Sequence, residues 1–420
     1  MIHIVDAPTG QGKTNAAINY MNSHDERFLF VTPYKTELER IIKSCPEKKF
    51  CQPEAIYETN SRVVTKKNGI KKLFRSRKNI VTTHALFRLF DNDMIEFCKK
   101  YKYTLILDEV TDVADVYEEL KADDLRVLLK HFVTVDNCLL KWREDKTGYN
   151  GNKFLREKGL CEMRCLYLYG DTTMLWQFSI DIFKAFENSF VLTYMFNGQL
   201  QKYYYDFHEL KYDRWYVRGN SLETYELTTE RQSYGNPSQY KPLIEILDNP
   251  KLNAVGDDYY ALSSNWYDNE ENHFKIEQVR KNLTNYYKHY VKGGSDACLW
   301  TCFNSNEKDL KGDGYAKGRI ACNAKATNQY RDKKNLAYVV NSFINPNIKN
   351  FFEGNGIPVD GDAYALSSLI QWVWRSAIRD GKPIKLYLPS SRMRNLFISW
   401  LNDEVDIEWE TEQNAIYTLA

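Results

Sequence analysis

Short apolar runs alternate with polar, helix-like stretches through the first two hundred residues of the chain. Each apolar run is short and nearly continuous, as in strands that are buried on both faces. The runs occupy residues 2–5, 28–33, 79–84, 103–109 and 165–169. Strands of this kind separated by helices predict a doubly wound α/β domain with a parallel sheet. Ligands of such a domain are expected at the carboxyl ends of the strands.

The second half of the chain repeats this alternation after a polar, tyrosine-rich stretch without a clear period. Helices are expected at residues 241–247 and 272–292, strands at 297–303, 319–322, 336–340 and 384–388, and a helix at 363–378. The sequence therefore predicts a first domain at 1–202, a connector at 203–240 and a second α/β domain at 241–420, whose amino-terminal segment is helical.

Composition excludes several classes of protein. The 420 residues carry a formal charge of +1, so any basic surface must be local. No apolar run is long enough to span a membrane and nothing resembles a signal peptide, so a cytoplasmic protein without a membrane partner is expected.

The nine cysteines form no regular framework. Cys161 and Cys165, and likewise Cys298 and Cys302, are four residues apart, without the C-x₂-C spacing of most zinc sites. Free thiols are the favoured interpretation over a four-cysteine metal site.

Residues 2–14, IHIVDAPTGQGKT, predict a buried strand that leads directly into a phosphate-binding loop. Gly10, Gln11 and Gly12 form a tight turn whose backbone N–H groups can surround a phosphate. Lys13 is placed to reach the β- and γ-phosphates, and Thr14 to hold Mg²⁺ at the start of the next helix. The pattern predicts ATP and Mg²⁺ as cofactors, although Ala7 stands where the usual loop begins with glycine.

Two further segments carry candidate catalytic residues. Asp108 and Glu109 end an apolar strand, where P-loop ATPases hold Mg²⁺ and orient the attacking water. Gln371, Arg375 and Arg379 are four residues apart, and on one helix they would share a face. That face either presents arginine fingers to the phosphates or is simply the solvated side of an amphipathic helix.

Together these motifs resemble those of superfamily 2 helicases, the group that contains the DEAD/DEAH-type ATPases. Residues 7–14 match the first motif, including its alanine, 108–111 resemble motif II and 371–379 resemble motif VI. Weaker matches are residues 31–38 (Ia), 82–84 (Ib), 170–173 (III), 299–303 (IV) and 324–328 (V). The resemblance implies two RecA-like domains with helical insertions and an ATP site in the cleft between them.

The resemblance also implies nucleic-acid contacts, at Pro33, Lys35, Thr83, His84, Thr327 and Asn328. A basic run at 66–78 either joins these contacts or is an ordinary solvated surface. Three departures stand out: no residues precede the first strand to read adenine, motif III is divergent, and Trp374 replaces a glycine. Loose base selectivity is therefore expected.

The predicted function is that of an ATP-dependent helicase or translocase, in the style of bacteriophage or mobile-element enzymes. Its expected partners are single-stranded or forked nucleic acid, with DNA favoured over RNA, and replication proteins of a bacterial host cytoplasm. Two alternatives remain: a motor that moves duplex DNA without separating it, and a nucleic-acid-binding module that ATP switches.

Overall fold

The first α/β unit is built on a seven-stranded sheet. The computed structural model describes residues 1–57, 64–292, 294–323 and 329–405. In sheet order the strands are β14 (Glu226–Thr228), β13 (Tyr212–Arg218), β1 (Ile2–Asp6), β12 (Ser189–Thr193), β6 (Tyr103–Asp108), β2 (Arg27–Thr32) and β5 (Ile80–Thr83). All neighbours are parallel except β13 and β14. The parallel sheet predicted from the apolar runs is confirmed.

Helices cover both faces of this sheet, which explains the continuous apolar runs. One face packs against α1 (Lys13–Ser23) and α2 (Lys35–Ser44). The other packs against α3 (Lys66–Arg75), α4 (His84–Phe87), α5 (Asn92–Lys100), α8 (Ile180–Phe183) and α9 (Leu200–Phe207). The short strands β3 (Ile56–Tyr57) and β4 (Val64–Thr65) pair beside α3.

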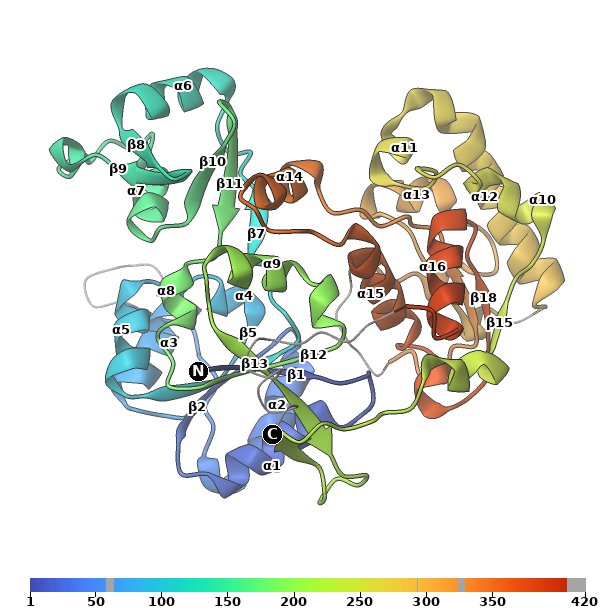
Figure 1. Cartoon of the computed structure of the whole chain (residues 1–420), viewed down its shortest axis with the longest axis horizontal. Coiled ribbons are helices and arrows are strands. Elements are labelled where there is room, and N and C mark those ends of the chain that lie inside the picture. Colours follow the sequence, from blue (N-terminus) through green and yellow to red (C-terminus); the bar gives the residue numbers. More distant parts are fainter. Residues whose placement is uncertain (58–63, 293, 324–328, 406–420) are drawn as a thin grey trace.

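An antiparallel sheet is inserted between β6 and β12 and stands apart from the first sheet (Figure 1). Its order is β7 (Ala114–Val116), β11 (Thr173–Gln177), β10 (Leu166–Tyr169), β9 (Leu139–Trp142) and β8 (Val133–Asp136), with helices α6 (Ala122–His131) and α7 (Leu155–Glu162). The expected strand at 165–169 exists, but its place in the parallel sheet was wrong. It pairs with β11 through a hairpin, and an apolar run alone does not encode its partner.

The first sheet also extends beyond the expected domain boundary. Strands β13 and β14 lie within the stretch that the sequence suggests as a connector, and they form one edge of the sheet. The chain then passes through a 3-10 helix, Pro237–Leu243, into β15. Part of the tyrosine-rich stretch therefore belongs to the first unit, as the edge of its sheet.

The second α/β unit has a four-stranded parallel sheet, ordered β15 (Ile244–Ile246), β18 (Ile384–Tyr387), β17 (Asn335–Tyr338) and β16 (Cys298–Thr301). Helices α15 (Gly361–Val373) and α16 (Ser391–Leu401) pack on one face. The opposite core includes residues of α10 (Pro250–Asn253), α11 (Ser264–Asp268), α12 (His273–Asn285) and α13 (Glu307–Leu310). Helix α14 (Pro346–Gly354) instead reaches the first unit.

Two expectations for this unit were wrong. Residues 241–247 were expected to be helical, but β15 occupies 244–246 as the edge strand. Residues 319–322 form only an isolated bridge between Arg319 and Trp300. Both are short segments whose conformation depends on the neighbouring strand.

Candidate active site

The predicted phosphate loop, residues 7–12, lies between β1 and α1. Gly10 and Gly12 have φ angles of 97° and 75°, which favour glycine. The loop begins where Ala7 N donates to Thr193 O of β12 (3.1 Å). The Lys13 ammonium donates to the carbonyls of Ala7 (2.5 Å) and Pro8 (3.1 Å), so it lies within the loop. Burial lowers the pKa of Lys13, against the opposing effect of Glu109.

The acidic pair at the end of β6 faces this loop. Asp108 Oδ1 accepts a hydrogen bond from Thr14 (3.2 Å), and Oδ2 accepts one from Thr32 (3.3 Å). Burial, reinforced by the neighbouring Glu109, raises the pKa of Asp108 to about 7. Glu109 has a positive φ of 67°, a strained conformation of the kind that gathers at functional sites. The structure thus brings the two expected Mg²⁺ ligands, Thr14 and Asp108, into contact.

The predicted helix bearing Gln371, Arg375 and Arg379 is broken, so the single-face argument was wrong. Helix α15 ends at Val373, and a short 3-10 helix runs from Ala377 to Asp380. Ser376 Oγ donates to Val373 O (2.7 Å), and Ala377 N turns away to Lys333 O (2.9 Å). These bonds replace helical ones and end α15.

The break nevertheless brings these three residues to one place. Gln371, Arg375 and Arg379 line a cavity of about 40 Å³ together with Thr9, Glu109, Val110 and Trp374. Arg379 also lines a neighbouring cavity of about 140 Å³ with Gly12, Lys13, Thr14, Asp108 and Glu109. Residues about 360 positions apart therefore meet across one cleft.

Arg375 is the most unusual charge in this cleft. Its side chain is 5% exposed, and its Nε and Nη1 have no hydrogen-bond partner among the described residues. Burial lowers the pKa of Arg375, and likewise that of Arg379. A buried guanidinium without a full set of acceptors is costly unless an anion completes it. The chemistry of this donor set fits phosphate oxygens.

The described residues among those expected to touch nucleic acid lie at or just after the paired carboxyl ends of β2 and β5. Pro33 lines the 140 Å³ cavity, and Lys35 is exposed at the start of α2. Thr83 caps α4 by accepting from Leu86 N (3.4 Å). His84 is only 8% exposed, and its Nε2 lies 3.0 Å from Asp108 O, beneath the acidic pair. Thr327 and Asn328, with the rest of 324–328, lie outside the described residues.

The basic run at 66–78 is largely engaged within the first unit. Lys67 and Lys71 pair with Asp91 (2.9 and 2.8 Å), and Lys71 also pairs with Asp93 (2.7 Å). Arg75 and Arg77 lie over the rings of Phe97 and Tyr101. These contacts hold α3 against α5.

Residues 170–173, suggested as motif III, lie at the exposed tip of the β10–β11 hairpin. The strand between β1 and β6 is β12, which is followed by Tyr194 and Met195. Asp6 accepts hydrogen bonds from Met195 N (2.9 Å) and Phe196 N (3.1 Å) and thereby fixes this turn beside the phosphate loop. Sequence reasoning missed β12 because the insertion separates it from the earlier strands.

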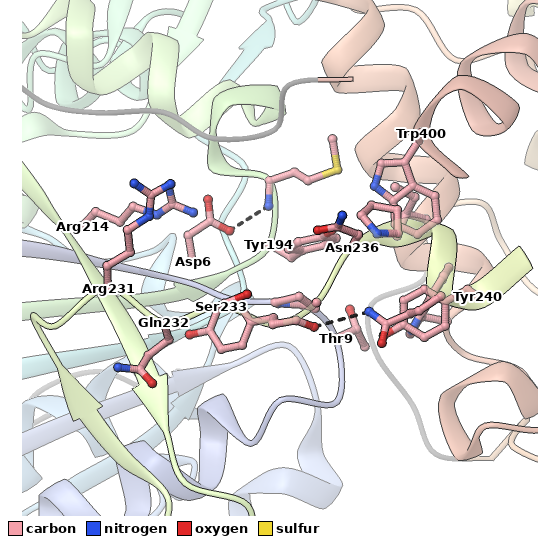
Figure 2. Close-up of a pocket in the computed structure, with 18 residues that line it drawn as sticks. Asp6, Thr9, Tyr194, Arg214, Arg231, Gln232, Ser233, Asn236, Tyr240 and Trp400 are labelled. Carbon is pink, nitrogen blue, oxygen red and sulfur yellow. Dashed lines mark hydrogen bonds between the residues drawn. The ribbon is translucent and has the colours of Figure 1, made fainter. Parts of the chain in front are cut away.

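A larger cavity, of about 390 Å³, adjoins the phosphate loop at Pro8 and Thr9. Figure 2 shows Asp6 of the first unit on one side and Tyr240 and Trp400 on the other, with Tyr194, which follows β12, between them. Much of its remaining wall is formed by residues 231–237 and 239, which have no periodic pattern that sequence reasoning could use.

Comparison with known proteins places the chain in a family. It is 37% identical over 413 residues to the SPbeta prophage-derived uncharacterized protein YonV of Bacillus subtilis (strain 168), covering 96% of this chain and 99% of that protein. The chain belongs to the YonV family. Residues 238–401 match the YonV C-terminal Rossmann-like domain, and this YonV domain is the second α/β unit described above.

Two solved structures have a distant structural similarity to this chain. One is titled XPD_Helicase, with 11% identity, a TM-score of 0.46 and coverage of 96% of this chain and 95% of that one. The other is S. tokodaii Xpd4, with 12% identity, a TM-score of 0.45 and coverage of 99% and 95%.

The described part of this YonV-family chain contains no helix long and apolar enough to cross a membrane. Within the same residues, no three His, Cys, Asp or Glu side chains gather as a metal-binding group. All nine cysteines are free thiols. A site of the kind formed by Thr14 and Asp108 takes most of its Mg²⁺ ligands from phosphate and water.

Proposed function

We propose that this YonV-family protein is a nucleoside triphosphatase of the superfamily 2 helicase type, which uses hydrolysis to move along nucleic acid. The observation that carries the proposal is the buried Arg375, whose Nε and Nη1 have no hydrogen-bond partner among the described residues. It lines a cavity together with Glu109 and Arg379. An arginine placed in this way, across a cleft from a phosphate loop, matches the arginine fingers of phosphoryl-transfer enzymes.

Each residue then has a distinct role. Gly10, Gln11, Gly12 and Lys13 surround the phosphates, and Thr14 with Asp108 would hold Mg²⁺. When bound, Mg²⁺ neutralises charge on the β- and γ-phosphate oxygens. Glu109 orients the attacking water and takes its proton. Arg375 and Arg379 stabilise charge on the transferred phosphoryl group, and Gln371 positions it from the end of α15.

Hydrolysis would drive motion because the arginines and the phosphate loop belong to different units. Loss of the γ-phosphate removes the anion that both units bind, so the cleft is free to open. A single strand of nucleic acid bound along the carboxyl ends of β2 and β5 would contact the exposed Lys35 first. His84 is left out of this interface because its ring is buried.

The decisive experiment measures ATP turnover against a panel of single- and double-stranded DNA and RNA. We expect single-stranded DNA to stimulate turnover most, which is in keeping with a prophage relative. Lys13→Ala and Glu109→Gln should each reduce turnover by at least about 100-fold. Lys281→Ala, a change at an exposed position of α12 outside both cavities, is the matched control and should leave turnover unchanged.

The outcomes separate the alternatives. If ATP turnover survived both active-site substitutions, the assignment of these residues to ATP hydrolysis would be wrong. ATP binding without hydrolysis in the presence of any nucleic acid would favour the alternative of a nucleic-acid-binding module that ATP switches. A forked duplex with labelled strands then distinguishes unwinding from movement along an intact duplex.

A further inference from the structure

The aromatic ring of Tyr225 lies against the phosphate loop from outside. It belongs to the turn between β13 and β14, more than two hundred residues downstream of that loop. A Cβ atom built on Gly12 would come within 2.5 Å of three carbons of this ring. The ring therefore occupies the space that a side chain at position 12 would need. Only glycine permits both the positive φ and this approach.

The turn is fixed to the helix that follows the loop. Asn19 of α1 donates from Nδ2 to Tyr225 O (2.8 Å) and to Leu222 O (3.0 Å). Tyr225 is partly exposed, so part of its surface remains available beside the loop. A ring held by its own backbone and by Gly12 loses little freedom when a ligand stacks on it.

The cavity at the loop is too small for a whole nucleotide. Its volume is about 140 Å³, and its lining is mostly polar and includes Gly12, Asn15 and Arg379. Sites that enclose a whole ligand usually exceed about 300 Å³. The nucleoside must therefore extend beyond the phosphate cavity, and Tyr225 lies directly past its wall at Gly12.

We infer that the β13–β14 turn forms the nucleoside subsite and that Tyr225 stacks on the base of a bound nucleoside triphosphate. This inference rests on the proposed triphosphatase function. Because every base has a flat face, stacking alone does not select among bases. Polar groups of the turn form hydrogen bonds within the turn: Thr224 Oγ1 accepts from Asn220 N (3.2 Å) and Ser221 N (3.0 Å). The substrate class is therefore nucleoside triphosphates in general.

The test compares ATP, GTP and inorganic tripolyphosphate as ligands of the full chain in the presence of Mg²⁺. Wild-type protein should bind ATP and GTP within about threefold of each other, as a non-selective stack requires. Tyr225→Ala should weaken both by about tenfold, the size of a lost base–aromatic stack. Tyr225→Phe, the matched control, should bind like wild type. Tripolyphosphate, which has no base, should bind all three proteins equally.

Each result has a defined meaning. Equal weakening of tripolyphosphate and ATP by Tyr225→Ala would show that the ring merely supports the loop and would overturn the inference. Unchanged ATP affinity would overturn it too, while leaving the triphosphatase proposal intact. A wild-type protein that binds none of the three ligands would overturn the proposed function itself. Tripolyphosphate binding also verifies that the variant is folded.

Discussion

At the scale of single residues, burial of the Asp108 carboxylate lowers the free energy of unfolding at neutral and higher pH. Its pKa is about 7 in the folded chain, against about 4 for an unfolded aspartate. Below about pH 4 both states hold the proton, so Asp108 makes no difference to the free energy of unfolding. Between about pH 4 and 7 only the folded state holds it, and stability falls as the pH rises.

Asp108→Asn removes this ionisation, so the variant should be as stable as wild type near pH 4. Near pH 8 it should be more stable by about 4 kcal/mol, because wild type alone then carries a buried charge. Urea denaturation of both proteins at a series of pH values measures the difference. A stability difference that does not change with pH would contradict this account.

Arg375 provides a second prediction at this scale. Arg375→Lys keeps a positive charge but lacks the planar guanidinium, whose Nε and Nη1 have no partner within the described part of the chain. We expect kcat for ATP hydrolysis to fall at least 100-fold while the KM for ATP changes little, because the contact is made mainly in the transition state. Arg126→Lys on exposed α6 serves as control. A rise in KM at constant kcat would make Arg375 a binding residue only.

At the scale of elements, the sequence predicted those features whose signal is local. The loop at 7–14 and the acidic end of β6 depend on contiguous residues, and the structure has them where expected. The turn after β12 was missed because its role depends on which strand lies between β1 and β6. The hairpin at 170–173 was misassigned for the same reason, since a strand's neighbours are set by tertiary pairing.

The reassignment of the motif III position leads to a prediction for two turns. Asp171→Ala, at the exposed hairpin tip, should leave ATP turnover and stability unchanged. Asp6→Ala should lower stability by about 2–4 kcal/mol, because it leaves the buried N–H groups of Met195 and Phe196 without an acceptor. Thermal denaturation and turnover of both variants check this. Loss of turnover in Asp171→Ala alone would restore the original assignment.

At the scale of the whole molecule, the two α/β units are joined at a second place besides the connector. Helix α14 leaves the second unit and lies beside the inserted sheet and α9 (Figure 1). The Phe351 ring lies 5.1 Å from that of Phe207 and 6.0 Å from that of Tyr167, between centroids. Asp360 N donates to Tyr203 Oη (3.0 Å), just before α15 begins.

This second junction precedes the helix that carries Gln371, so it helps to set the position of the arginines. Phe351→Ala should lower stability by about 3 kcal/mol, as other large truncations in cores do. It should also lower kcat for ATP hydrolysis several-fold, because a freely moving second unit presents Arg375 and Arg379 less often. Denaturation and turnover, both measured well below the melting temperature, give the two quantities separately.

Phe274→Ala is the matched control, since Phe274 lies in the same unit but is 70% exposed. It should change neither stability nor kcat. If Phe351→Ala lost stability but kept full kcat, the junction would serve folding alone. The connector and the contacts of α15 with the turn after β12 would then suffice to position the arginines. Loss of kcat under conditions where the variant remains folded requires instead that the cleft be held from two sides. In that case the inserted sheet contributes to the proposed motor activity, because together with α9 it provides the surface on which α14 is anchored.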